Sequence, residues 1–227
     1  MVINSEVKLL QILEEERSNW IVKFNDDGNN TTLFKLGSKD FFEERDSLIQ
    51  VMKKHLQVAK KHTIHSINME GMDYLSPSAA NVSMSAALEI SKQTKIPIIF
   101  TQVLSEVLEG LKAAPSAART EDRILWAVDI AGNPHILGTI PDRLVEILDI
   151  LKDKGRVSAS EIAALHGEEN SKKYINKFSV YLQELFNTGL INREKIAGSA
   201  RDEAGRGWTY VYRPAYVDIF ETLMKRF

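Results

Sequence analysis

The sequence predicts an α/β N-terminal domain, with a mixed sheet and helices, over residues 1–138, and a smaller domain of helices and a β-hairpin over residues 139–227. Two observations predict this division. Apolar strand-like runs alternate with amphipathic helical segments up to about residue 137, as is typical of an α/β layer. Beyond Pro141, three helical segments with clear start and stop residues precede two strand-like runs.

Composition limits the functional classes. The 227 residues are 44% apolar and 26% charged, which suits two globular domains. The absence of cysteine excludes disulfides, thiolate nucleophiles and Cys-ligated metal sites. The first residues lack a signal-peptide pattern, and no apolar run is long enough to span a bilayer. We therefore expect a cytoplasmic protein without membrane contact.

The N-terminal elements follow from periodicity and turn chemistry. Residues 5–17 read as an amphipathic helix, and residues 20–24 and 32–36 as strands joined by an Asn-, Asp- and Gly-rich turn. Asp40 caps a helix that extends to about residue 61, and residues 63–69 form a strand.

The remaining N-terminal elements alternate in the same way. Ser76 and Pro77 open a helix that ends near residue 93. A strand over 95–100, a helix over 103–113, a loop over 114–122 and a hairpin formed by 124–130 and 135–137 complete the domain.

The C-terminal helices carry clear terminal signals. The first begins at Pro141 and stops at Gly155, and Ser158 with Glu161 forms a capping box for the second. Asn170 can cap the third helix, which Gly189 ends. Two short helices and a longer third are what a helix-turn-helix requires.

The third helix has an apolar and a polar face. One side carries the apolar or aromatic residues Ile175, Phe178, Tyr181, Leu182, Leu185 and Phe186, and the other side carries Lys172, Lys173, Asn176, Lys177 and Gln183. Residues 171–213 hold eight Lys and Arg against four Asp and Glu, a net +4 within a chain of net −2. Positive charge is therefore concentrated around this helix.

Two strands, over 190–195 and 209–212, flank a Gly-rich segment that contains Arg201 and Arg206. The series Leu182, Leu185, Gly189, Leu190 and Ile191, followed by Gly205-Arg206-Gly207, resembles the pattern of winged helix-turn-helix transcriptional regulators. The resemblance covers about 75 residues. It implies that the third helix enters the major groove of double-stranded DNA, with Lys172, Lys173, Asn176 and Lys177 facing DNA and with Arg201 and Arg206 in the wing.

A winged helix can instead bind a protein. Four acidic residues border the predicted surface and would repel phosphate: Glu168, Glu169, Asp202 and Glu203. The lysines would then only solvate a surface, and both interpretations stay open on the sequence alone.

A second resemblance covers residues 66–113. A strand, the series Asp73-Tyr74-Leu75-Ser76-Pro77-Ser78, a small-residue helix, a strand and a helix look like the STAS domain of anti-sigma-factor antagonists. This implies a STAS-like domain that binds a partner or signal, with Ser78 as the matching phosphorylated serine. Ser76, Pro77 and Ala79 depart from the family's loop, and Ser76-Pro77 is also an ordinary helix start.

No phosphate-binding loop, dinucleotide fingerprint or nucleophile elbow occurs. We expect neither enzymatic activity, nor a cofactor, nor a metal site. The prediction is a DNA-binding transcriptional regulator that forms a homodimer. The alternatives are a non-enzymatic adaptor of a partner-switching type and, third, a small-molecule enzyme built on the α/β domain. A terminal helix over 216–227 would form a dimer contact or pack on its own winged helix.

Overall fold

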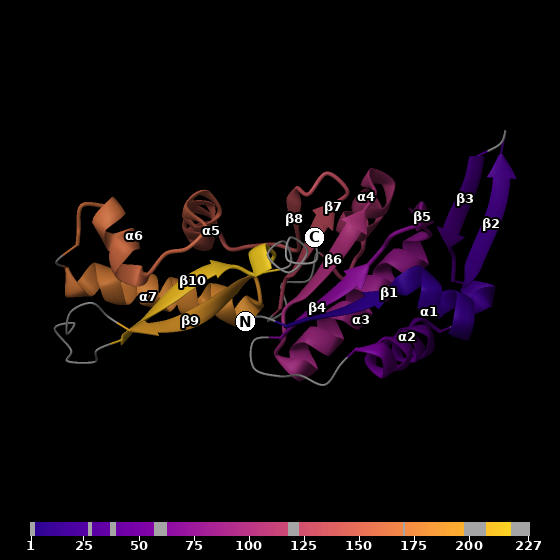
Figure 1. Ribbon diagram of the computed structural model, residues 1–227, viewed down its shortest axis with the longest axis horizontal. Helices are drawn as coiled ribbons and strands as arrows, with labels where there is room; N and C mark the ends of the chain where they lie inside the picture. Colours follow the sequence, from indigo (N-terminus) through magenta and orange to yellow (C-terminus); the bar gives the residue numbers. More distant parts are fainter. Residues whose placement is uncertain are drawn as a thin grey trace.

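A five-stranded sheet lies at the centre of this mixed α/β protein (Figure 1). The computed structural model describes residues 3–26, 29–36, 40–56, 63–117, 123–169, 171–197 and 208–218. Four strands run parallel and the fifth is antiparallel to its neighbour. In spatial order they are β1 (Ile3–Lys8), β4 (Thr63–Asn68), β6 (Ile98–Val103), β7 (Leu125–Asp129) and β8 (Pro134–Leu137). The mixed sheet that the sequence predicts is confirmed.

One face of the sheet is covered by helices of the N-terminal half. Val7, Ile67 and Phe100 alternate with residues of the opposite face and pack, buried, against these helices. The helices are α1 (Leu9–Glu16), α2 (Phe41–His55), α3 (Pro77–Thr94) and α4 (Ser105–Ala113). Together they form the first hydrophobic core.

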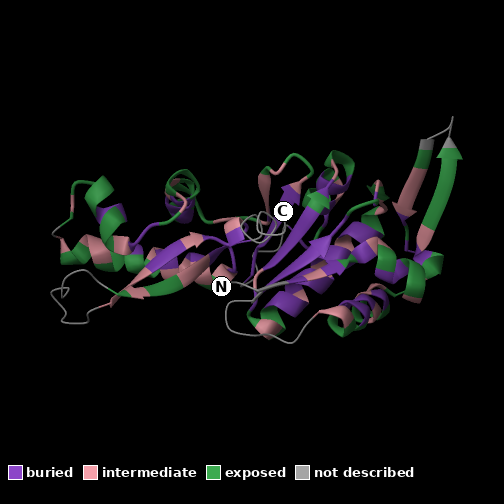
Figure 2. Ribbon diagram, viewed as in Figure 1, coloured by how far each residue is buried: buried purple, intermediate pink, exposed green. Residues whose placement is uncertain are grey.

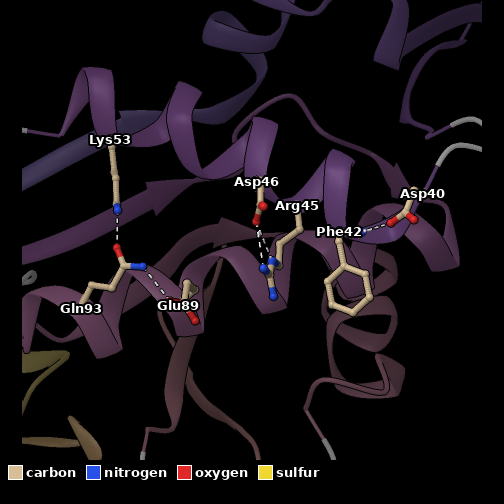
Figure 3. A network of polar contacts seen from close by, with 7 residues as sticks. All are labelled: Asp40, Phe42, Arg45, Asp46, Lys53, Glu89 and Gln93. Atoms are coloured by element: carbon tan, nitrogen blue, oxygen red, sulfur yellow. Dashed lines mark hydrogen bonds and ion pairs between the residues drawn. The ribbon is translucent and has the colours of Figure 1, made fainter.

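The N-cap of α2 and the solvent side of the contact between α2 and α3 are polar (Figure 3). The carboxylate of Asp40 accepts a hydrogen bond from Phe42 N at 2.7 Å, which confirms the predicted cap of α2. Lys53 of α2 donates to the Gln93 side chain of α3, and Gln93 Nε2 donates to Glu89 Oε1 at 2.7 Å. These contacts lie on the solvent side of two helices whose opposite sides are buried.

A smaller sheet of three strands lies at one end of the molecule, where its hairpin projects from the body (Figure 1). β2 (Ile21–Asp26) follows a 3-10 turn at Ser18–Trp20 and pairs antiparallel with β3 (Asn29–Phe34), which confirms the predicted hairpin. The sequence did not predict β5 (Tyr74–Leu75), which pairs parallel with β3.

The C-terminal elements have the predicted order. They are α5 (Asp142–Lys154), α6 (Ala159–Leu165), α7 (Lys172–Thr188) and the antiparallel strands β9 (Ile191–Ala197) and β10 (Trp208–Pro214). The capping box is confirmed, because Ser158 Oγ accepts from Glu161 N and Glu161 accepts from Ser158 N. Gly155 and Gly189 end α5 and α7 at positive φ angles of 71° and 85°.

These C-terminal elements complete a second hydrophobic core on the other face of the central sheet. Ile64, Ile99 and Trp126 of the sheet belong to the same buried cluster as Leu148 of α5 and Leu185 of α7. The Trp126 indole also meets the Tyr216 ring edge to face, with centroids 4.7 Å apart. The segments on the two sides of the predicted boundary near residue 138 therefore share one core.

Hydrogen bonds join the segment that leads into β7 to the end of α7. Arg123 Nη1 donates to the Asn187 carbonyl at 2.8 Å, Ile124 N to the Thr188 carbonyl at 2.9 Å, and the Trp126 indole to the Leu190 carbonyl at 2.8 Å. Arg123 Nε also donates to Ser91 Oγ of α3 at 2.9 Å. Burial lowers the pKa of Arg123 to about 10, so its guanidinium stays charged at neutral pH.

Three expectations need correction. Residues 3–8 form β1 and only residues 9–16 are helical, because β1 pairs with β4 along its whole length. Helix α2 ends at His55 rather than near residue 61, and the backbone of Leu56 is extended. The cap position of α7 is Ser171. Asn170 and most of the predicted terminal helix lie outside the described residues.

The close approach of Gly189 and Arg123 gives a stability prediction. A Cβ at Gly189 would lie 2.8 Å from Arg123 Nη2, in addition to the strain of a side chain at positive φ. Gly155 also has a positive φ, but a Cβ added there would meet no atom within 4 Å, so it is a matched control. We expect Gly155→Ala to cost about 1 kcal/mol of unfolding free energy, and Gly189→Ala clearly more.

Urea unfolding of the single and double variants separates the two costs. In an Arg123→Ala background the clash between the new Cβ and the guanidinium is absent. Gly189→Ala should then lower the unfolding free energy about as much as Gly155→Ala does, by about 1 kcal/mol. An unchanged cost of Gly189→Ala in that background would show that the guanidinium is not the obstacle.

His65 gives a prediction for pH dependence. It is buried on β4, its Nδ1 has no hydrogen-bond partner in the described structure, and burial lowers the pKa of its imidazole to about 4. The unfolded chain takes up this proton near pH 6.5 and the folded chain only near pH 4, so stability is lost as the pH falls through this window. Between about pH 7.5 and about pH 5 the loss from His65 is about 2 kcal/mol.

Denaturant unfolding at these two pH values tests the assignment. We expect His65→Leu to lose about 2 kcal/mol less than the wild type on acidification. Equal losses in the two chains would assign the pH dependence to other groups.

Candidate nucleic-acid interface

Helix α7 is held by its buried side, which leaves its other side to solvent (Figure 2). Phe178, Leu182 and Leu185 are its buried residues. The His166 ring, which follows α6, stacks on the Phe178 ring with centroids 5.0 Å apart. The turn from α6 into α7 is thereby packed against the first half of α7, and the exposed surface of that half is fixed in direction.

Lys173 and Asn176 lie on this exposed surface. Both side chains are exposed. Among the described residues neither has a hydrogen-bond or ion-pair partner. They stand three residues apart, so they are neighbours on one helix face. Of the four residues of α7 that the sequence predicts to face DNA, these two are free to meet a ligand in the described structure.

Lys172 and Lys177 are exposed but already engaged. Lys177 Nζ lies 5.7, 5.5 and 5.6 Å from the ring centroids of Tyr174, Phe178 and Tyr181. Its ammonium group is thus drawn toward the aromatic side of α7. Lys172 also interacts with another group. Their charges still add to the field at this end of the helix.

The acidic residues are unevenly placed around α7. Glu184, the one carboxylate within α7, forms an ion pair with Arg143 of α5 at 3.1 Å. It lies in the C-terminal half of the helix, away from Lys173. Glu169, which precedes the helix, is exposed and opposes an anionic ligand. The first half of α7 is therefore positive, with a negative border.

The hairpin of β9 and β10 presents cations and aromatic rings on its α7 side. The Arg193 guanidinium carbon lies 4.3 Å from the Phe186 ring centroid and 4.7 Å from the Tyr210 centroid, and Nη1 donates to Gln183 Oε1 at 2.7 Å. This contact fixes the hairpin on α7. Farther along the same face, Lys195 Nζ lies 4.0 Å from the Trp208 ring centroid.

This cation–aromatic face was not predicted from the sequence. The available signal was the alternation of cations in β9 with aromatic residues in β10, which become cross-strand neighbours when the hairpin closes. The predicted wing residues Arg201 and Arg206 lie outside the described residues.

Ser78 lies in the other half of the chain, in the first turn of α3. Its side chain is exposed. The neighbouring Ser76 caps this helix, because its Oγ accepts a hydrogen bond from Ala79 N at 3.2 Å. The interpretation of Ser76-Pro77 as a helix start is confirmed, and modification of Ser78 stays a prediction.

Other polar clusters have structural explanations. The Asp129 carboxylate accepts hydrogen bonds from His135 Nε2 at 3.0 Å and from Asn133 N at 2.8 Å, which closes the turn between β7 and β8. The hydrogen bond from His135 is the main reason that the pKa of Asp129 falls to about 2. In the described ranges, no three His, Asp or Glu side chains gather as a metal site, and no helix is long and apolar enough to cross a membrane.

Comparisons of the chain with protein-family models, curated proteins and solved structures find no match. Function is therefore inferred from the residues of this chain alone.

Proposed function

We propose that the chain is a DNA-binding transcriptional regulator and that α7 enters the major groove of double-stranded DNA. The observation that carries the proposal is the exposed first half of α7, where Lys173 and Asn176 are free and no carboxylate occurs within the helix before Glu184. A cation and an amide side by side on a helix match phosphate and base edges.

The order of the C-terminal elements supports a winged helix-turn-helix. Helix α5 is followed by Val157, which forms a β-bridge with Tyr212, and then by α6, α7 and the hairpin of β9 and β10. In a helix-turn-helix the second helix of the motif presents its N-terminal residues to base edges. In α7 these are Lys172, Lys173, Asn176 and Lys177, and the hairpin would be the wing that carries Arg201 and Arg206.

The N-terminal half is proposed as a STAS-like domain that binds a partner or signal, with Ser78 as a candidate phosphorylation site. We propose further that the protein is cytoplasmic, has no enzymatic activity, and binds DNA as a homodimer. Two copies would place two α7 helices on half-sites about 34 Å apart. Sedimentation of the chain with a duplex that carries two half-sites measures this stoichiometry, and a lone monomer on the duplex would contradict the dimer.

Charge reversal at Lys173 tests the DNA-binding proposal. We expect the full chain to bind random duplex DNA at low salt, and Lys173→Glu to weaken binding on all sequences. Loss of one phosphate contact should also make the slope of log affinity against log salt shallower by about 0.9. Fluorescence anisotropy at several salt concentrations measures both quantities.

Lys92→Glu is the matched control, because Lys92 is an exposed lysine on α3 in the other half of the chain. It changes the net charge equally and should leave binding unchanged. If both variants lose affinity to the same degree, overall charge and not α7 explains binding. If the wild type fails to bind at low salt, the proposed function is wrong.

One observation favours a second candidate function, a non-enzymatic adaptor. On the small sheet, Val22, Phe24 and Tyr74 are 40%, 46% and 47% exposed, and their cross-strand pairing places them on one face. An extended apolar segment of a partner protein could add to the free edge of β2 and cover this face. The adaptor function would be supported if the wild type binds such a partner, if Phe24→Ser abolishes this binding, and if the wild type does not bind DNA.

A further inference from the structure

We propose that Asn176 and Val180 form the base-reading pair of α7 and that they select A·T pairs, with Asn176 on adenine and Val180 on the thymine methyl group. The inference rests on the proposed function. It adds the class of sequence that the helix would recognise and the two side chains that would recognise it.

The two residues share a face with Lys173. Positions 173, 176 and 180 are spaced three and four apart, so they form one stripe along α7. Asn176 is exposed and Val180 is 55% exposed. The buried residues Phe178, Leu182 and Leu185 occupy the opposite side. The stripe therefore points away from the core over the first three turns of α7.

Asn176 is the amide of α7 that is free to bond a base through both its groups. The other two amides are occupied, because Gln183 Oε1 accepts from Arg193 and Gln183 Nε2 donates to Asn187 Oδ1 at 2.8 Å. In the described structure Asn176 makes no such bond. A free amide that offers one donor and one acceptor matches N7 and N6 of adenine.

Val180 is an apolar side chain within a polar stripe. The Lys177 ammonium group does not cover Val180, because it lies near the Tyr174, Phe178 and Tyr181 rings. In the major groove the apolar group that a base offers is the thymine 5-methyl, which cytosine lacks. Contact with Val180 would thus favour thymine over cytosine.

The spacing along α7 fits neighbouring base pairs. Four residues of helix rise about 6 Å, and successive base pairs rise about 3.4 Å. Asn176 and Val180 would therefore reach bases one or two steps apart, and Lys173, nearer the helix start, would reach the adjacent phosphate.

Selection from a random duplex pool, followed by thymine-to-uracil replacement, tests the pair. We expect the full chain to enrich a site with A·T pairs at two neighbouring or next-neighbouring positions. At one of these, uracil should weaken wild-type binding about fourfold, the value of one buried methyl group. Val180→Ala should bind thymine and uracil duplexes equally.

At the other A·T position, Asn176→Ala should prefer A·T over other base pairs roughly tenfold less than the wild type does. Its binding should still weaken when uracil replaces thymine. Val145→Ala is the matched control, because Val145 of α5 is 41% exposed and lies outside the stripe. It should behave as the wild type in both assays.

The outcomes separate the two proposals. No binding of the wild type at low salt overturns the proposed function itself. Binding without sequence preference, a selected site that lacks A·T pairs, or an equal uracil effect in wild type and Val180→Ala overturns the base-reading pair and leaves DNA binding intact.

Discussion

The end of α7 is fixed by donors that come from another part of the chain. The last carbonyls of a helix have no hydrogen-bond partner within it. Here Arg123 and Ile124 donate hydrogen bonds to carbonyls of the last turn of α7. The Trp126 indole donates to the carbonyl of Leu190, just beyond the helix. Because β9 begins at the next residue, the same bonds also set the start of the hairpin. The first half of α7 then lies at the end of the molecule far from the central sheet (Figure 1). The exposed lysine-bearing surface depends on this attachment.

The attachment explains how a guanidinium can be buried there. Arg123 is 6% exposed, and its hydrogen-bond partners are Ser91 Oγ and the Asn187 carbonyl. Both lie in the last turn of a helix, α3 and α7 respectively, where the helix dipole is negative. The two helix ends offset only part of the cost of burying this charge, because Nη2 of Arg123 has no hydrogen-bond partner among the described residues and burial lowers the pKa to about 10. A substitution of Arg123 would therefore remove hydrogen bonds to α3 and to α7 at once.

Local signals in the sequence were sufficient for most elements. The capping box of Ser158 and Glu161 starts α6, and Gly189 ends α7. Both signals act through hydrogen bonds and backbone angles of neighbouring residues, so the sequence could predict these two helix ends. Segment 3–8 could not be predicted in this way, because its apolar residues merge with those of α1 and its strand form depends on pairing with β4 about 60 residues away. The polar face of α7 followed from periodicity. Periodicity could not predict that Lys177 lies near three aromatic rings or that Arg193 packs against Phe186, because both arrangements depend on how the side chains pack in the folded protein.

The modest charge of the candidate interface limits how it could work on DNA. Each neutralised phosphate contributes about −0.9 to the salt slope, and α7 carries only three lysines, one of which is drawn toward aromatic rings. Glu169 reduces the field further. Affinity at physiological salt would then need contacts to bases, contacts from the cations of the hairpin, or a second bound copy, because the phosphate contacts of α7 alone give too little. Asn176 and Val180 can supply the first, and for this reason the discrimination between bases, more than the bare affinity, is the property by which this surface should be judged.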